Sequence, residues 1–368
     1  MDESPIHVTK SFLPPWDKYE LYAKQVFESA HLTNRGPFCQ QLTKELKKYL
    51  NLDFLHPVSN GTLALMLAIR QAGLGGKKVV TTPFSYVATV SSLLWEGCTP
   101  VFADIDQDTL CLSPKSILET LQRHPDAAGI MPVHVYGNAC DIEEIERICS
   151  DHSLVCIYDA AHAFGARYKG RSLLDYGDYA VCSFHATKLF HTVEGGCIVS
   201  HSEEQEHAIE LLHAFGHIGD QHYSLGINGK LSELHAAMGL AVLPYIGEIM
   251  QSRSEVFGYY EEFLPKEGVA RPTLQDGLQY NYAYFPVLFS SEAELLLIKS
   301  ALEEANIFPR RYFYPSLTTL PYLPEISKKC LCPIADSIAP RVLSLPLYPG
   351  LQKGDVQRIA EILARNIR

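Results

Sequence analysis

This sequence has fewer positively charged residues than negatively charged ones. Its 31 lysines and arginines face 42 aspartates and glutamates, which leaves a formal net charge of −11. A surface of this sign repels nucleic acid and anionic membranes on average. The sequence therefore predicts neither nucleic acid nor a membrane as a partner, although a local basic pocket for a small anion is compatible with it.

Long apolar runs and paired metal-binding cysteines are also absent. No uncharged apolar stretch approaches the ~20 residues that a membrane-spanning helix needs, and the opening MDESPIHVTKSFLPPW has no apolar core of a signal peptide. None of the ten cysteines belongs to a CxxC pair, and Cys330 and Cys332 lack the spacing of zinc ligands. We expect reduced, buried thiols, no bound metal and a cytoplasmic location.

In place of repeats or low-complexity tracts, the chain alternates between short apolar and amphipathic segments. Its 368 residues suggest about two domains. We expect an N-terminal arm over residues 1–35, a large domain over 36–245 and a small domain over 246–368. The alternation predicts an α/β fold with a mostly parallel sheet covered on both faces.

The expected elements place the chemistry at one edge of that sheet. Strands are expected near 56–59, 78–82, 99–103, 129–134, 154–158, 179–184 and 196–200. Helices are expected near 16–30, 38–50, 61–73, 85–96, 113–123, 142–152, 232–262 and 353–368. Ligands of such sheets bind beyond the carboxyl ends of the strands, so the residues that follow each strand are the candidates for the ligand site.

Two strand ends carry features that suit a flat, phosphorylated ligand. Gly61 and Thr62 open a helix, where free N–H groups and the positive end of the helix dipole favour a phosphate. An ordinary N-cap by Ser59 or Asn60 explains the same residues. Tyr86 follows the next strand, where its ring can stack on a cofactor or simply line the cleft.

Two further strand ends carry ionisable groups. Asp159 ends a buried strand, where an unpaired carboxylate is costly and needs a cationic partner, and His162 follows shortly. Lys188 lies five residues after Ser183. Taken singly, Asp159 can be a turn cap, His162 a core histidine and Lys188 a solvated surface residue.

Together the four strand ends favour one cofactor, pyridoxal 5′-phosphate (PLP). A helix start would bind its phosphate and an aromatic side chain would stack on its ring. The aspartate would keep the pyridine nitrogen protonated, so that the ring accepts electrons, and the lysine amine would form the Schiff base. The ordinary explanations would have to hold four times independently.

The sequence resembles the DegT/DnrJ/EryC1/StrS aminotransferases, which act on nucleotide-linked keto sugars. The resemblance runs from about Phe12 to the C-terminus. It is most specific in Asn60-Gly-Thr62, PFSYVAT (83–89), YDAAHAFG (158–165), SFHATKLFHTVEGG (183–196) and GINGKLSELHAAMG (226–239). It implies a type I, aspartate-aminotransferase-like PLP fold with a smaller C-terminal α+β domain.

The resemblance also implies roles for the residues of the cofactor site. Lys188 would be the Schiff-base lysine and proton shuttle, Asp159 the partner of the pyridinium nitrogen, and His162 a neighbour of the ring oxygen. Tyr86 would stack on the ring. The phosphate would be bound by Gly61, Thr62 and Ser183, and by Asn228 of a partner subunit in a homodimer.

The substrate residues follow in the same way. The sugar nucleotide is expected between the arm at Thr33, the 185–194 loop and the segment Arg310-Arg311-Tyr312, with both arginines at the diphosphate or simply on a solvated basic face. Lys230 stands where many relatives carry arginine, which keeps the charge but loses the bidentate fork.

The resemblance also bears on the reaction. Relatives that dehydrate sugars replace the lysine by histidine, so Lys188 favours transamination. His185 and Glu194 resemble members that act at C4, with C3 as the alternative. L-Glutamate would donate its amino group in a ping-pong cycle that aminates a dTDP-linked 4-keto-6-deoxy sugar for a surface glycan such as an O-antigen. A non-catalytic regulator and a PLP enzyme acting on amino acids are the competing hypotheses.

Overall fold

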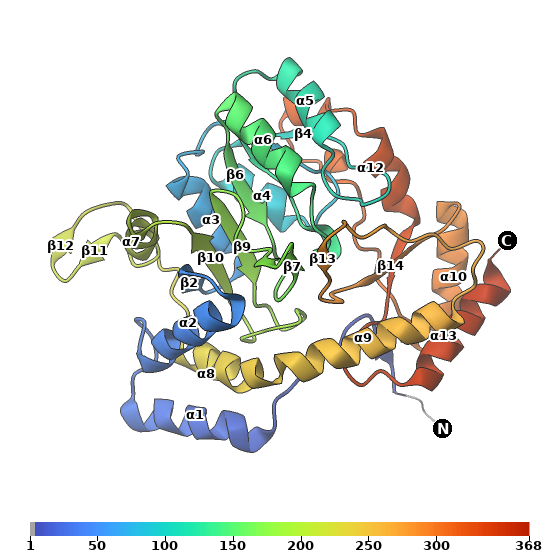
Figure 1. Ribbon diagram of the computed structural model, residues 1–368, viewed down its shortest axis with the longest axis horizontal. Coiled ribbons are helices and arrows are strands. Elements are labelled where there is room, and N and C mark those ends of the chain that lie inside the picture. The colour runs from blue at the N-terminus through green and yellow to red at the C-terminus, as the bar shows by residue number, and fades with distance from the viewer. Residues whose placement is uncertain (1–3, 368) are drawn as a thin grey trace.

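A seven-stranded sheet forms the centre of the computed structural model, which describes residues 4–367 (Figure 1). From edge to edge its strands are β2 (Phe54–Val58), β10 (Gly196–Ser200), β9 (Tyr179–Ser183), β6 (Val155–Asp159), β5 (Ala127–Met131), β3 (Lys78–Thr81) and β4 (Thr99–Phe102). Neighbours from β9 to β4 are parallel, and β10 is antiparallel to β9 and to β2. The predicted α/β class and mostly parallel sheet are confirmed.

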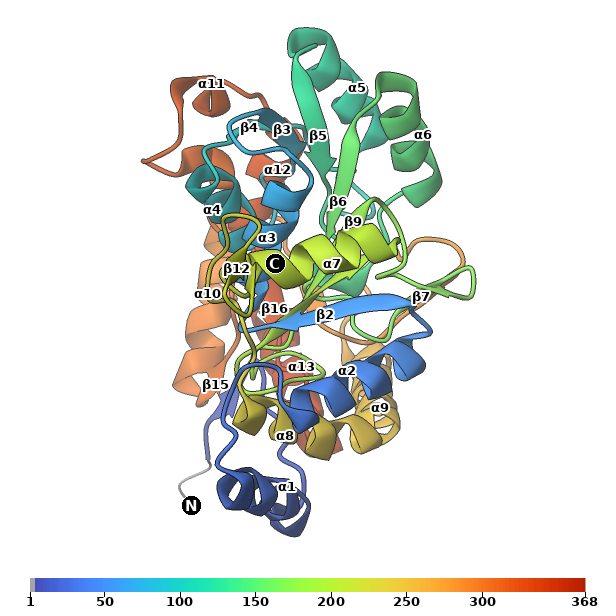
Figure 2. The same ribbon diagram turned by 90° about the vertical axis from the view of Figure 1, so that its left-hand side faces the viewer.

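Both faces of the sheet are buried, because successive strand residues point to opposite sides. Val80 and Ile130 share a core with α2 (Pro37–Leu50), α5 (Pro114–Arg123) and α6 (Ile142–His152). Val79 and Met131, one position away, pack with α3 (Gly61–Gln71) and α7 (Glu203–Leu212). Figure 2 shows this layering at β2, which lies between α7 and α2.

The strand directions bring six carboxyl ends to one edge. Strands β3, β4, β5, β6 and β9 run the same way, and β2 joins them because two antiparallel pairings separate it from β9. The residues after Val58, Thr81 and Met131 therefore meet Asp159 and Ser183 along a single line. Strand β10 starts at this edge.

The long helical region expected near 232–262 is divided in two. Helix α8 (Glu233–Val242) and helix α9 (Ile246–Phe263) are joined by a 3₁₀ turn at Leu243–Tyr245. Pro244 in this turn has no N–H to continue an α-helix. The buried Glu233 carboxylate accepts the backbone N–H groups of Phe38 and Cys39, at 2.8 and 3.1 Å, and so caps α2.

The C-terminal part has a core of its own. Strands β14 (Phe285–Leu288) and β16 (Val342–Leu345) pair antiparallel, and α9, α10 (Glu292–Glu304) and α13 (Lys353–Asn366) pack around them. The N-terminal β1 (Ile6–His7) joins this part by pairing with β15 (Ile307–Phe308). The side chains of Phe313 and Leu317 pack in the large core instead. The boundaries at 35 and 245 stay a prediction.

The remaining elements are short or peripheral. They are α1 (Trp16–Ser29), α4 (Ala88–Trp95), η1 (Val135–Gly137), β7 (Arg167–Tyr168), β8 (Arg171–Ser172), β11 (His217–Ile218), β12 (Gln221–His222), β13 (Leu278–Gln279), η3 (Leu317–Thr319), α11 (Glu325–Lys328), α12 (Pro333–Ile338) and η4 (Ala339–Arg341). All ten cysteines are free, and all but Cys330 are buried. None of the helices within residues 4–367 has the length and apolar character to cross a membrane.

Candidate active site

The start of α3 forms a cradle against the ends of β9 and β10. A Cβ atom at Gly61 would lie 3.1 Å from the Ser183 Cβ, and one at Gly196 would lie 2.9 Å from the backbone nitrogen of Gly61. The Asn60 side chain caps the helix by accepting the Leu63 N–H at 2.8 Å. The N–H groups of the first helical residues have no acceptor inside a helix, so this close-packed cradle presents them to a ligand.

The carboxylate of Asp159 lies at the end of β6 and is 4% exposed. Its Oδ2 accepts the Thr89 hydroxyl at 2.7 Å, and its Oδ1 accepts the Ala161 N–H at 3.2 Å. Burial raises the pKa of Asp159 above its ordinary value, while the Thr89 hydrogen bond, the Ala161 hydrogen bond and the charge of Lys188 lower it in part. A cation beside this carboxylate would offset its burial.

Lys188 and His162 line one small cavity. Ala161, Phe164, Thr187, Leu189, Ala283 and Tyr284 complete its wall. The Lys188 Nζ donates to the Tyr284 hydroxyl at 3.4 Å. Burial, together with the charge of Lys188, holds the pKa of His162 well below its usual range, so the imidazole is neutral at neutral pH.

The His162 ring is packed between two aromatic side chains. The Phe313 ring stacks on it with centroids 5.5 Å apart, and the Tyr284 ring meets it edge-on at 4.9 Å. Its Nδ1 atom is buried without a hydrogen-bond partner in the described structure. A ligand oxygen in the cavity would satisfy that nitrogen.

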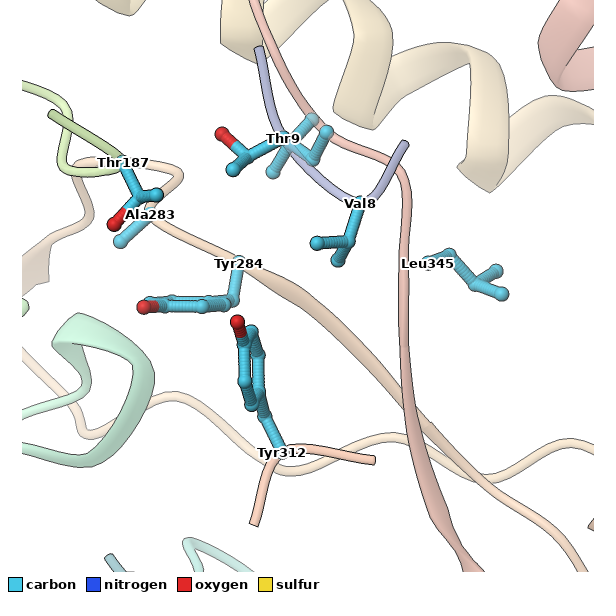
Figure 3. A pocket seen from close by; sticks show the side chains of 8 residues that line it. Val8, Thr9, Thr187, Ala283, Tyr284, Tyr312 and Leu345 are labelled. Carbon is cyan, nitrogen blue, oxygen red and sulfur yellow. The ribbon is translucent and has the colours of Figure 1, made fainter. Parts of the chain in front are cut away.

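A second cavity adjoins the first (Figure 3). It shares Thr187, Ala283 and Tyr284 with the Lys188 cavity, and Val8, Thr9, Tyr312, Leu345 and Leu347 form the rest of its wall. In Figure 3 the hydroxyl end of Tyr312 points toward Tyr284, and the two rings lie 5.9 Å apart and nearly perpendicular. The residues that follow β1 and residues of the C-terminal part thus line a space next to the Lys188 cavity.

The neighbourhood of Tyr312 includes several predicted site residues. Burial raises the pKa of Tyr312, and the charges of Arg310 and Lys188 lower it in part. The Arg310 guanidinium lies 5.7 Å from the centre of the Tyr312 ring. The charge of an ionised Tyr86 also raises the pKa of Tyr312. The Tyr86 side chain itself is 58% exposed. An open ring at the edge of the site is available to cover a flat ligand.

The 185–194 loop is tied to the N-terminal arm. The Ser11 hydroxyl donates to the Ala186 carbonyl at 2.6 Å, and the His191 Nε2 lies 2.6 Å from the Phe12 carbonyl oxygen. Within the loop, the His185 Nε2 lies 3.6 Å from a carboxylate oxygen of Glu194. The arm therefore meets this loop through residues 11 and 12.

Three other predicted residues lie elsewhere in the chain. Thr33 is exposed in the turn before α2, and among residues 4–367 no contact joins it to the Lys188 cavity. The Arg311 guanidinium donates to the Glu292 carboxylate at 2.6 Å and to the Pro340 carbonyl at 2.8 Å. Asn228 is exposed on the segment that follows the β11–β12 hairpin. Their roles at a ligand stay predictions.

Lys230 ends that same segment. Its amine lies 4.9 Å from the centre of the Phe215 ring, and partial burial lowers its pKa. The neighbouring Gly229 carbonyl accepts the Ser59 N–H at 2.8 Å, which fixes the segment beside the turn that precedes α3. Lys230 is therefore a cation near the cradle.

Sequence reasoning missed several residues that the fold brings to the site. These are Ser85, Thr89, Gly196, Tyr284 and Phe313. Thr89 belongs to the PFSYVAT motif, but its contact with a strand 70 residues away has no local signal. Tyr284 lies in the tyrosine-rich run 280–284, whose position against Lys188 depends on how the C-terminal part packs.

The residues present fit PLP. The cradle offers N–H groups for a phosphate, and His162, which lines the Lys188 cavity, has a buried Nδ1 without a hydrogen-bond partner in the described structure. The buried Asp159 carboxylate calls for a cation such as a protonated pyridine nitrogen. Lys188 supplies the amine beside them. An α/β fold with this donor set is that of a PLP-dependent enzyme.

The family follows from comparison with known proteins. The profile of the DegT/DnrJ/EryC1/StrS aminotransferase family matches residues 17–364, so this chain belongs to that family and is a PLP-dependent aminotransferase. It is 38% identical to dTDP-4-amino-4,6-dideoxy-D-glucose transaminase from Shigella dysenteriae, over 98% of this chain and 99% of that protein. The protein of the same name from Escherichia coli is 34% identical, over 99% of both chains.

Solved structures give the same fold. The crystal structure of DesI in the presence of its TDP-sugar product superimposes with a TM-score of 0.91 at 29% identity, over 98% of this chain and 92% of that one. PseC from Helicobacter pylori, at 23% identity, has a TM-score of 0.90 over 99% of both chains. The type I fold that the resemblance implied is confirmed.

Replacing Tyr284 by phenylalanine removes the one hydroxyl that contacts Lys188 in the described residues. We expect Tyr284→Phe to bind PLP normally but to slow a single turnover with L-glutamate by about tenfold, because the lysine amine loses a polar partner that holds it in place. Tyr176→Phe is the matched control, since that hydroxyl donates to the Tyr168 carbonyl far from the cavity. Rapid-mixing absorbance measurements give both rates. A wild-type rate in Tyr284→Phe would contradict the assignment.

Proposed function

We propose that this enzyme transfers an amino group from L-glutamate to C4 of a nucleotide-linked 4-keto-6-deoxy sugar, dTDP-4-keto-6-deoxyglucose in the first instance. The observation that carries the proposal is the 38% identity, over nearly the full length of both chains, to a dTDP-4-amino-4,6-dideoxy-D-glucose transaminase. The second relative of that name and DesI, solved with its TDP-sugar product, support the same substrate class.

The choice of C4 over C3 also has support in the 185–194 loop. His185 and Glu194 are the residues that resemble C4-specific members, and the His185 Nε2 lies 3.6 Å from a carboxylate oxygen of Glu194. GDP-perosamine synthase from Vibrio cholerae is 28% identical over 93% of this chain and 94% of that protein. A UDP-sugar 3-aminotransferase from Acidithiobacillus ferrooxidans is 30% identical over 84% of this chain, which makes C3 the alternative outcome of the assay.

Each residue of the site has a task in this reaction. When bound, PLP supplies an electron sink at its ring. Asp159 would hold the proton on the ring nitrogen, and the neutral His162 would lie at the ring oxygen. The Lys188 amine would act as a general acid and base that moves the proton between the cofactor carbon and the sugar carbon. Gly61, Thr62 and Ser183 would bind the phosphate.

The cations near the site suit two anionic substrates in turn. Arg310 is exposed beside Tyr312, where it can meet a diphosphate or a carboxylate. Lys230 lies next to the cradle. Arg311 would have to leave Glu292 to bind a substrate, so we expect it to contribute less to substrate binding than Arg310. The product, a deoxyamino sugar nucleotide, is a building block for a surface glycan such as an O-antigen.

The reaction is tested by incubating the PLP-loaded protein with L-glutamate and dTDP-4-keto-6-deoxyglucose. We expect 2-oxoglutarate and a dTDP-sugar whose NMR spectrum places the amine on C4. Lys188→Ala should lose turnover by about 10⁴-fold or more, because no other residue moves the proton. An amine on C3, or a Lys188→Ala protein that retains turnover, would overturn the proposal.

We also propose that the working unit is a homodimer in which Asn228 binds the phosphate of its partner's cofactor. The β11–β12 hairpin and its flanks project away from the body of the protein (Figure 1). They expose a row of large apolar side chains, at Phe215, Ile218, Tyr223, Leu225 and Ile227. Such a protruding apolar segment fits burial against a second copy.

A mixture of two inactive variants tests this arrangement. Co-expressed Lys188→Ala and Asn228→Ala chains should form mixed dimers with one site that has both residues intact. At random pairing this restores about a quarter of the wild-type activity. Activity at a limiting PLP concentration is measured against each variant alone. If Asn228 serves its own site, no mixed dimer regains activity and the proposal fails.

A further inference from the structure

A row of buried hydroxyl groups ends on the carboxylate of Asp159. The Ser85 Oγ lies 2.8 Å from the Thr89 Oγ1, which lies 2.7 Å from the Asp159 Oδ2. Ser85, Thr89 and Asp159 are 3%, 0% and 4% exposed, so water cannot replace these contacts. A lost partner would leave a buried polar atom unsatisfied.

The direction of this row depends on the charge of Asp159. An ionised carboxylate only accepts hydrogen bonds. The single hydrogen of the Thr89 hydroxyl must then go to Asp159, and the Ser85 hydroxyl must donate to Thr89. A protonated Asp159 could itself donate, and the row would lose this fixed direction. The arrangement therefore complements the ionised carboxylate.

We propose that Thr89, supported by Ser85, is a positioning residue that keeps Asp159 ionised and aimed at the ring nitrogen of PLP. The Thr89 hydrogen bond lowers the pKa of Asp159 against the effect of burial. In the described structure the other hydrogen bond on this carboxylate comes from the Ala161 backbone. Thr89 is thus the one side chain whose replacement can change the hydrogen bonding of Asp159.

Few other titratable groups face Asp159. Lys188, on the segment after β9, lowers the pKa of Asp159 by its charge. His162, two residues after Ala160, is held neutral by burial, and burial raises the pKa of Cys182 on the adjacent β9 to about 12. Neither therefore carries a charge near neutral pH, and the Thr89 hydroxyl, the Ala161 N–H and Lys188 remain as the groups that favour the ionised form.

The chain position of Thr89 suits this role. Thr89 is the second residue of α4 and lies three residues after Tyr86. The same short segment therefore carries an exposed aromatic ring and a buried hydroxyl that reaches Asp159 on β6. One turn of chain would serve both the ring face of the cofactor and the carboxylate that pairs with its ring nitrogen.

The experiment compares Thr89→Val, Thr89→Ser and the matched control Thr81→Val. Thr81 is also fully buried, and its hydroxyl donates to the Met131 carbonyl at 2.8 Å on a neighbouring strand. The apoproteins are titrated with PLP to obtain the dissociation constant. They are then reconstituted with PLP that carries ¹⁵N in its ring, whose chemical shift reports protonation of the pyridine nitrogen. Neither measurement needs L-glutamate or a sugar, so the result is independent of the proposed substrate.

We expect Thr89→Val to bind PLP about tenfold more weakly, because the buried carboxylate loses a charge-assisted hydrogen bond. Its ring nitrogen should shift toward the unprotonated value. Thr89→Ser restores the hydroxyl and should match the wild type. Thr81→Val should lose stability while its PLP affinity and nitrogen shift stay at wild-type values.

Two results would overturn the proposal. One is a Thr89→Val protein with wild-type PLP affinity and nitrogen shift. The other is a Thr81→Val protein that changes as much as Thr89→Val, which would make the effect a general loss of packing. If Thr89→Val does not fold, Ser85→Ala decides. It should weaken PLP binding and move the nitrogen shift in the same direction by a smaller amount, and wild-type values there would refute the role of the row.

Discussion

The site depends on a carboxylate that is buried at the end of a central strand, where an ionised group costs stability. Asp159 is 4% exposed, and burial raises its pKa despite two hydrogen bonds and a nearby lysine. A buried charge is tolerated when a partner of opposite sign or a set of donors compensates it. We propose that the protonated ring nitrogen of PLP is such a partner, and that the cofactor and the fold stabilise each other through this residue.

The rest of the site follows from where that carboxylate lies. The parallel strands bring β3, β6 and β9 to one edge, so their following residues surround the same point. Gly196 lets the start of α3 approach β10 closely, which forms the cradle. Tyr284 and Tyr312 of the C-terminal part line the adjoining cavities. In the proposed site, the phosphate, ring and amine would each meet a different element.

Local pattern predicted much of this and failed where packing decides. The alternation of strands and helices predicted the sheet, because apolar strands flanked by amphipathic helices have few other ways to be buried. The Asn60-Gly61-Thr62 helix start, Asp159 and Lys188 are readable because strand ends of a parallel sheet converge. Other site residues contact segments that are far away in the chain, and no local sequence pattern predicts these contacts. They are Thr89, Tyr284 and Phe313.

Other expectations meet the structure only in part. Pro244 interrupts the helical region at a turn that the apolar pattern alone does not reveal. Arg311 carries the charge that a diphosphate needs, yet its guanidinium is paired with Glu292 and stacks 3.4 Å from the centre of the Tyr314 ring. The N-terminal arm reaches the 185–194 loop through Ser11 and Phe12. In each case the residue type was informative and its partner depended on the tertiary fold.

We propose that the burial of Asp159 destabilises the folded protein and that bound PLP offsets this loss of stability. Because the folded-state pKa lies above the unfolded value, stability from this group is present at low pH and is lost as the pH rises through the folded-state pKa. Urea unfolding of the wild type and of Asp159→Asn at pH 7, without and with PLP, gives the free energy of unfolding of each protein in each condition.

The account predicts that without PLP the Asp159→Asn protein is the more stable of the two, and that saturating PLP reverses the order. Asp104→Asn is the control, because that buried carboxylate accepts N–H groups of Ile105, Ile334 and Ala335. Its replacement should lower the free energy of unfolding by the same amount without and with PLP. If Asp159→Asn is less stable than wild type by the same amount with and without PLP, then the carboxylate is a structural group and the account is wrong.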